Sequence, residues 1–174
     1  VDRSLLSRAA DGSGRLVMLD GVRRFALERL EEAGDVTAPA RHTDWFCSLA
    51  AQSERGVRSD RAKWWRARLH SDLANIRAVL DRLLAARDAE RGLTLLGDIW
   101  RFMQSAGHLI ELDRRLDHFF SLAEAAEQTA GRVKGLMAQG AVLVTAGPSL
   151  MSVWRRTATP SSSRSEIRLM IPSP

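Results

Sequence analysis

Apolar residues recur at helical spacing through most of the chain. From Asp20 to about Ala146 they fall every three or four residues, the period of an amphipathic α-helix. The pattern predicts successive helices from Asp20 to about Gly34, from near Pro39, from Ser59-Asp60, from Ala89 to Ser105, through Leu112–Ala123, and from Ala130 to Ala146. Ser71-Asp72 either starts a further helix or continues the one before it.

Two short strand-like runs come before the helices. Ser4–Arg8 and Arg15–Leu19 flank Asp11-Gly12-Ser13-Gly14, whose glycines allow the positive φ that a tight turn needs. This pattern predicts a β-hairpin. Because two strands alone are marginal in water, we expect the hairpin to pack on the following helix or on a missing partner.

The spacing of the elements indicates the fold class and the organisation of the chain. Short connections between helices favour antiparallel neighbours, so we predict a mainly α fold, an antiparallel helical-hairpin array that begins an α-solenoid. Three parts are expected: the hairpin at 1–19, a helical repeat-like domain at 20–146, and a tail rich in Ser, Pro and Arg at 147–174. The tail has no helical period and is expected to be disordered.

Charge weakens a nucleic-acid interpretation of this basic chain. The net charge is +5, but the tail from Pro148 carries four Arg and one Glu, a net +3. The preceding residues hold 22 basic and 20 acidic groups, a net of only +2. With one cysteine, neither a disulfide framework nor a cysteine-based zinc module can form. With no long apolar run and no secretory signal pattern, we expect a cytoplasmic protein that does not enter membranes.

Catalytic motifs are missing from the sequence. There is no phosphate-binding G-x-x-x-x-G-K-[ST] loop, no G-x-S-x-G elbow and no H-E-x-x-H pair. The four histidines lie far apart, Cys47 is expected to be a small buried hydrophobe, and Asp113 and Asp117 are expected on a solvated helix face. The sequence therefore predicts a protein that is not an enzyme, with no catalytic, cofactor-binding or metal-binding residues.

Four stretches together resemble one protein family. Met18–Leu30 is similar to a segment of the type LETIREYALERL, and Arg41–Phe46 to RHADYF. Asp72–Leu80 is similar to EHDNLRAAL, and Gly92–His108 to GLRLAGALWRFWLLRGH. Their order and spacing resemble the winged-helix and tetratricopeptide-like region of large bacterial signal-transduction ATPase regulators of the LuxR and SARP kinds.

The resemblance implies a regulatory role for the helical part. In the family a P-loop domain precedes a winged helix and helical repeats, and no residue here matches the P-loop motif, so ATP is expected only in full-length relatives. The resemblance therefore implies a non-enzymatic helical interaction or sensor fragment of a transcriptional regulator, with room for a small-molecule inducer. The marker positions, expected to pack and to hydrogen-bond between helices, are Arg23, Phe25, Leu30, His42, Trp45, Asn75, Arg77, Trp100 and His108.

The predicted last helix has a wide apolar face with no helix expected after it. Val133, Leu136, Met137 and Val144 form this face, which we expect to bind protein partners or a second copy of the chain. Two alternatives remain open: a nucleic-acid-binding protein that uses the N-terminal wing and the basic tail, and a non-functional gene remnant. Nucleic-acid binding is the less favoured, because the body of the chain is nearly neutral.

Overall fold

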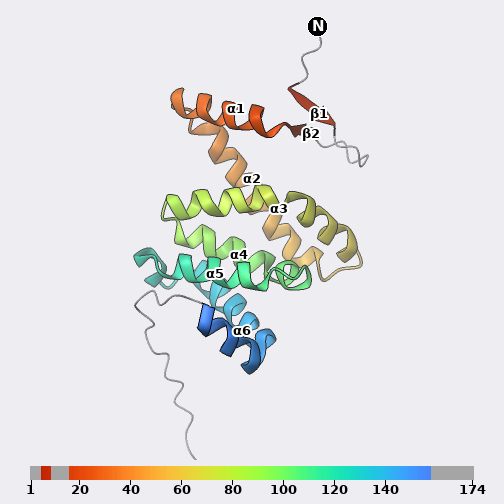
Figure 1. Ribbon diagram of the computed structural model, residues 1–174, viewed down its shortest axis with the longest axis vertical. Helices are drawn as coiled ribbons and strands as arrows, with labels where there is room; N and C mark the ends of the chain where they lie inside the picture. Colours follow the sequence, from red (N-terminus) through yellow and green to blue (C-terminus); the bar gives the residue numbers. More distant parts are fainter. Residues whose placement is uncertain (1–4, 9–15, 158–174) are drawn as a thin grey trace, which may run out of the picture.

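The computed structural model describes residues 5–8 and 16–157, with side chains described as far as Ala146 except at Glu31. The described residues form a two-stranded antiparallel hairpin followed by helices, so the predicted mainly α fold class is confirmed (Figure 1). The elements are β1 (Leu6–Arg8), β2 (Leu16–Met18), α1 (Asp20–Glu32), α2 (Thr37–Gly56), α3 (Ala62–Ala85), α4 (Ala89–Ser105), α5 (Leu109–Phe120), the short 3₁₀ helix η1 (Ala123–Ala126) and α6 (Ala130–Thr157).

Helix α4 is the centre of the array. It contacts α2, α3, α5 and α6, whereas α6 contacts only α4 and α5 extensively. The contacts thus run from α2 to α4 to α6 along one layer, while α3 and α5 cover the other side (Figure 1). From α2 to α6 each helix packs on its neighbours in sequence, and α4 also packs on α2 and α6, as in stacked helical hairpins that bury a continuous core.

The core is built from the apolar stripes that the sequence pattern indicates. The α4 stripe supplies Leu93, Leu96, Ile99 and Met103, each at most 1% exposed. Local signals fix the ends of α4 closely: the Asp88 side chain accepts a hydrogen bond from the Arg91 backbone N–H. Gly107, at φ +79°, then ends the helical run, as glycine commonly does after a helix.

Helix α3 decides between the two alternatives left open at Ser71-Asp72. These residues continue the preceding helix, because α3 is continuous from Ala62 to Ala85. The polar groups that resemble a helix start are satisfied within the helix. Ser71 Oγ donates to the Ala67 carbonyl at 3.0 Å, and Asp72 Oδ2 lies 2.7 Å from Arg68 Nε, one turn away.

Helix α6 corrects the predicted end of the last helix. It continues through Gly147-Pro148 to Thr157, so the predicted end at Ala146 is wrong. Proline removes one backbone donor and disfavours a helix interior, but it does not always end a helix. The rest of the predicted tail, residues 158–174, lies outside the described residues.

The hairpin and α1 make few contacts with the other helices and stand at one end of the array (Figure 1). Strand pairing has the expected hairpin register, with Ser7 opposite Val17. Apolar side chains here are open to solvent: Leu16 is 63% exposed and Leu19 is 74% exposed. The following helix does not cover the described residues of this hairpin, and a missing partner stays a prediction.

No helix in the described part of the chain is both long enough and apolar enough to cross a membrane.

Candidate protein-docking face

An exposed apolar stripe runs along α6. Val133 is 58% exposed, Leu136 41%, Met137 63% and Val144 85%. Leu136 and Met137 are three and four positions after Val133, and Val144 is seven after Met137, so the four residues lie on one side of the helix. Leu143, 47% exposed, lies beside Val144 and widens the stripe. Together these five residues form what we call the α6 face.

The opposite side of α6 is held firmly on α4. Ala138 and Val142 are buried there, and Gly131 lies against the Glu90 backbone so closely that a Cβ would be 2.3 Å from the carbonyl oxygen. The Gly131 backbone N–H also donates to Glu90 Oε1 at 2.9 Å. The α6 face is therefore presented by a helix with a fixed orientation.

A partly buried ion pair anchors the same contact. Lys134 Nζ lies 2.5 Å from Asp98 Oδ1, and the Asp98 side chain is only 1% exposed. Burial raises the pKa of the Asp98 carboxyl, and the Lys134 ammonium partly opposes that rise. The pair belongs to helix packing, and Lys134 is not free to meet a ligand.

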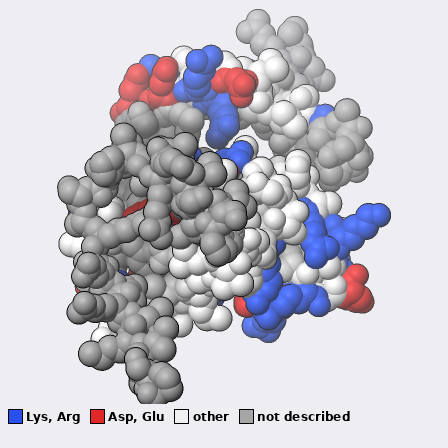
Figure 2. Space-filling model, turned by 60° about the horizontal axis from the view of Figure 1, so that its bottom comes forward, with Lys and Arg blue, Asp and Glu red and all other residues white. Residues whose placement is uncertain are grey.

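The α6 face has no acidic residue on its own helix, since Ala130–Thr157 contains neither Asp nor Glu. Figure 2 brings the lower end of the molecule in Figure 1 forward, where an area without charged side chains is visible, with side chains of both charges at its edge.

Among the marker residues, Arg77 makes the most extensive contact. From α3 it donates two hydrogen bonds to Glu111 of α5, Nε to Oε1 at 2.8 Å and Nη2 to Oε2 at 2.5 Å. Glu111 also accepts from Arg115, whose Nη1 lies 2.7 Å from Asp81 Oδ1 on α3. These four residues form what we call the α3–α5 charge network.

His42 and Asn75 meet between α2 and α3. The His42 ring is half-buried and lies 4.8 Å from the Phe46 ring, centroid to centroid. Burial lowers the pKa of His42, the nearby Arg82 guanidinium lowers it further, and a hydrogen bond with Asn75 opposes them. Asn75 Nδ2 also lies 3.5 Å from Asp72 Oδ1 within α3, so the role expected of Asn75 between helices stays a prediction.

The remaining marker residues are not brought together into one site. Arg23 and Phe25 are exposed, with Phe25 at 59%, and Leu30 is half-buried, all on α1. Trp45 is 61% exposed on α2. Trp100 is half-buried beneath the Arg101 guanidinium, which lies 4.2 Å from the ring centroid, and His108 precedes α5, where its backbone N–H donates to the Met103 carbonyl.

Buried carboxylates were missed by sequence reasoning. Asp72, Asp98 and Asp113 are at most 4% exposed. The placement of Asp113 on a solvated face is therefore wrong, whereas Asp117 is exposed as expected. The sequence spacing could have indicated the burial of Asp113, because Asp113 is one position from Leu112 and three from Leu116. Both leucines are fully buried, so Asp113 lies inside the apolar stripe of α5.

Cys47 is half-buried rather than fully buried. Its Sγ lies 3.8 Å from an Arg91 nitrogen. Burial raises the pKa of the thiol despite the contact with Arg91, so the reactive thiolate is disfavoured. Within residues 5–8 and 16–157, no group of three or more His, Cys, Asp or Glu is arranged to hold a metal ion.

Comparison with known proteins gives a partial likeness. A segment of 79 residues, 45% of this chain, is 35% identical to a protein of Mycobacterium tuberculosis H37Rv named "Putative HTH-type transcriptional regulator Rv0890c". It matches a Mycobacterium bovis protein with the same kind of name to the same extent. The match spans 9% of the length of each relative. No family model and no solved structure matches the chain. The chain is thus distantly similar to regulators of transcription over less than half of its length.

Proposed function

We propose that this chain is the helical, non-enzymatic interaction part of a bacterial regulator of transcription, and that it docks proteins on the α6 face. The observation that carries the proposal is the row Val133, Leu136, Met137 and Val144, exposed on a helix whose other side is fixed to α4. Contiguous exposed apolar side chains commonly mark interaction sites. The similarity to mycobacterial regulators supports the regulatory setting.

The pattern of helix contacts supports a tetratricopeptide-like arrangement. Helices α2 and α3, then α4 and α5, pack as successive hairpins, and α6 takes the place of the first helix of a third hairpin. In that arrangement α4 is covered by α5, whereas the corresponding side of α6 is the α6 face. The occupant that fits is therefore an apolar helix laid along α6, and in the purified chain the available occupant is a second copy.

We also propose which parts of an ATPase-type regulator the hairpin, α1 and the helical repeats correspond to. The hairpin and α1 correspond in the resemblance to the end of a winged helix, and their exposed Leu16 and Leu19 suit contact with the rest of such a domain. The repeats would transmit a signal to an ATPase-type regulator, as the resemblance implies. Duplex DNA binding has less support, because the residues before Pro148 carry 22 basic and 20 acidic groups and are nearly neutral together.

Sedimentation velocity over a concentration series tests the proposal. The chain should sediment as a monomer when dilute and as a dimer or larger species as its concentration rises. Leu136→Glu should abolish the larger species, because a carboxylate would be buried without a partner. Arg66→Glu, at an exposed position on α3, is the matched control and should leave association unchanged. Association that is unaffected by Leu136→Glu would refute docking on the α6 face.

A further inference from the structure

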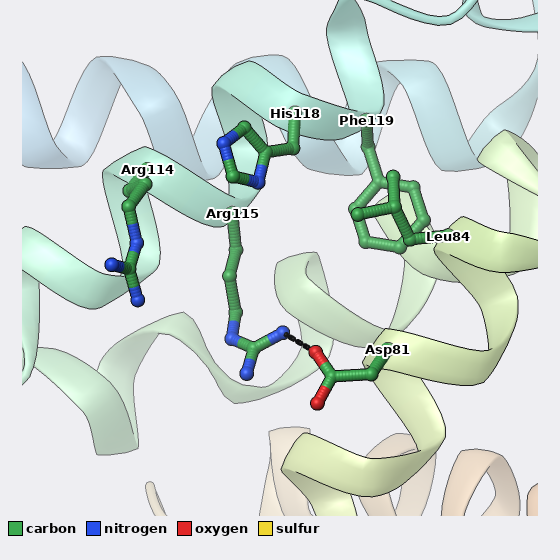
Figure 3. A pocket seen from close by; sticks show the side chains of 6 residues that line it. All are labelled: Asp81, Leu84, Arg114, Arg115, His118 and Phe119. Carbon is green, nitrogen blue, oxygen red and sulfur yellow. Dashed lines mark hydrogen bonds and ion pairs between the residues drawn. The ribbon is translucent and has the colours of Figure 1, made fainter.

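A small cavity lies between α3 and α5, away from the α6 face. Its volume is about 110 Å³, and it is lined by Asp81 and Leu84 of α3 and by Arg114, Arg115, His118 and Phe119 of α5. Since one water molecule takes up about 30 Å³ of liquid, this space suits a few waters or one carboxylate or phosphate group. Figure 3 shows the three basic side chains following one another along α5, with Leu84 and Phe119 beside them.

The basic side chains of the cavity come from one face of α5. Arg114 and His118 are four residues apart, and Arg115 and His118 are three apart, which places them on neighbouring turns. Arg115 is the most buried, with 13% of its side chain exposed, and it reaches across to Asp81 (Figure 3). The Arg114 guanidinium and the His118 ring make no hydrogen bond or ion pair with another residue in the described ranges. Arg114 and His118 can therefore donate hydrogen bonds to a ligand beside the guanidinium of Arg115, which its ion pair with Asp81 holds in place.

The charge around the cavity favours an anion. The α3–α5 charge network contains two guanidinium groups, on Arg77 and Arg115, and two carboxylates, on Glu111 and Asp81, which balance. Arg114 adds one further positive charge to the lining and makes no ion pair with another described residue, and the His118 ring adds a nitrogen that can donate a hydrogen bond. Asp81 does not repel an anion strongly, because its carboxylate is already paired with Arg115.

We propose that this cavity binds a small oxyanion, a carboxylate or phosphate group, through Arg114, His118 and the fixed guanidinium of Arg115. Arginine presents several N–H donors in a plane that matches carboxylate and phosphate oxygens. Leu84 and Phe119 supply an apolar wall for the remainder of the ligand. Anion binding at this cavity does not depend on the α6 face. The further idea that the ligand is an inducer of the regulator rests on the proposed function.

Backbone amide NMR of the ¹⁵N-labelled chain tests the site. Sodium benzoate and inorganic phosphate are titrated at constant ionic strength, with benzyl alcohol as the neutral counterpart of benzoate. We expect saturable shifts at Asp81, Arg114, Arg115 and His118 with the two anions and none with the alcohol. Tighter binding of benzoate would assign a carboxylate ligand, and tighter binding of phosphate would assign a phosphate ligand.

Variants separate this site from general charge effects. The double variant Arg114→Gln/His118→Gln should weaken anion binding by about tenfold, because two charge-assisted contacts are lost. Arg115 is left intact, since its loss would disturb the contact of α3 with α5. Arg66→Gln removes one exposed charge elsewhere on α3 and should change nothing. Leu136→Glu should leave anion affinity unchanged, so failure of the docking face and failure of this site are distinguishable.

Three results would overturn the proposal. The first is an anion-induced shift change of the same size in the double variant and in the parent chain, and the second is a shift change with benzyl alcohol as large as that with benzoate. The third is a shift change that does not saturate below about 50 mM anion, because such an affinity is too weak for a formed site.

Discussion

Arg77 of α3 holds Glu111 of α5 by two parallel hydrogen bonds, with Nε 2.8 Å from Oε1 and Nη2 2.5 Å from Oε2. Only 15% of the Glu111 side chain is exposed, so the pair is partly shielded from water. The hydrogen bond from Arg77, together with Arg115, lowers the pKa of Glu111 from 4.5 to about 2, although burial opposes this. The ionised carboxylate therefore ties together two helices that are not consecutive in the chain.

Glu111→Gln should lower the free energy of unfolding at pH 7 by about 2 kcal/mol, because two guanidinium groups lose their shared carboxylate. A carboxyl with a lowered pKa stabilises the fold at any pH above its unfolded pKa, near 4.5, and loses that effect as pH falls towards 2. The difference between parent and variant should therefore shrink between pH 4.5 and 2. Urea unfolding at a series of pH values measures it.

Glu28→Gln is the matched control for this effect, because Glu28 is exposed on α1. It should leave the unfolding free energy nearly unchanged at pH 7. A Glu111→Gln variant that is as stable as Glu28→Gln would contradict the role given to the α3–α5 charge network.

Replacing Gly97 or Gly140 with alanine should change the free energy of unfolding in opposite directions. A Cβ on Gly97 of α4 would lie 2.5 Å from Lys134 Cβ and 2.9 Å from the Lys134 backbone carbon, so α6 would have to move. We expect Gly97→Ala to cost about 1–3 kcal/mol. A Cβ on Gly140 meets nothing within 4 Å, so Gly140→Ala should stabilise the chain by about 0.5–1 kcal/mol. Thermal unfolding of dilute samples compares the melting temperatures of the two variants with that of the parent chain. Equal changes in melting temperature would refute the close packing of α4 on α6.

His42 should make stability fall as the solution becomes mildly acidic. Because burial lowers its pKa below the ordinary value of 6.5, the fold favours the neutral ring. The stabilisation is complete above the unfolded pKa and is lost as pH falls through the folded value. The free energy of unfolding should decrease below pH 6.5 in the parent chain and decrease less in His42→Gln. His70→Gln, at an exposed position, should follow the parent, and identical pH profiles for all three would contradict this assignment.

The array of helices was predictable because its signals are local. Asp88 begins α4 and Gly107 follows it, so the predicted bounds Ala89 and Ser105 are confirmed. The exposure of Val133 and Met137 also agrees with the apolar face indicated by helical spacing. Hydrophobic periodicity and helix-capping residues depend on residues close in the sequence, so both can be recognised from the sequence alone.

Features that depend on distant residues could not be predicted. Arg77 and Glu111 are 34 positions apart, and nothing in the sequence pattern says that they meet. Ser71-Asp72 resembles a helix start, and only the structure shows that Arg68 and the Ala67 carbonyl satisfy it within α3. The cavity between α3 and α5 was missed for the same reason, because Asp81 and Arg115 come from separate helices.

The central claim is that the α6 face docks a helix, and in the isolated chain a second copy. Cross-linking tests it at a chosen residue. In a Cys47→Ala background, Met137→Cys places a thiol on the α6 face, and Arg66→Cys places one on an exposed part of α3. With a short bismaleimide, Met137→Cys should yield mainly covalent dimer, which added Leu136→Glu should suppress, while Arg66→Cys stays monomeric. Equal dimer yields from Met137→Cys and Arg66→Cys would contradict the claim.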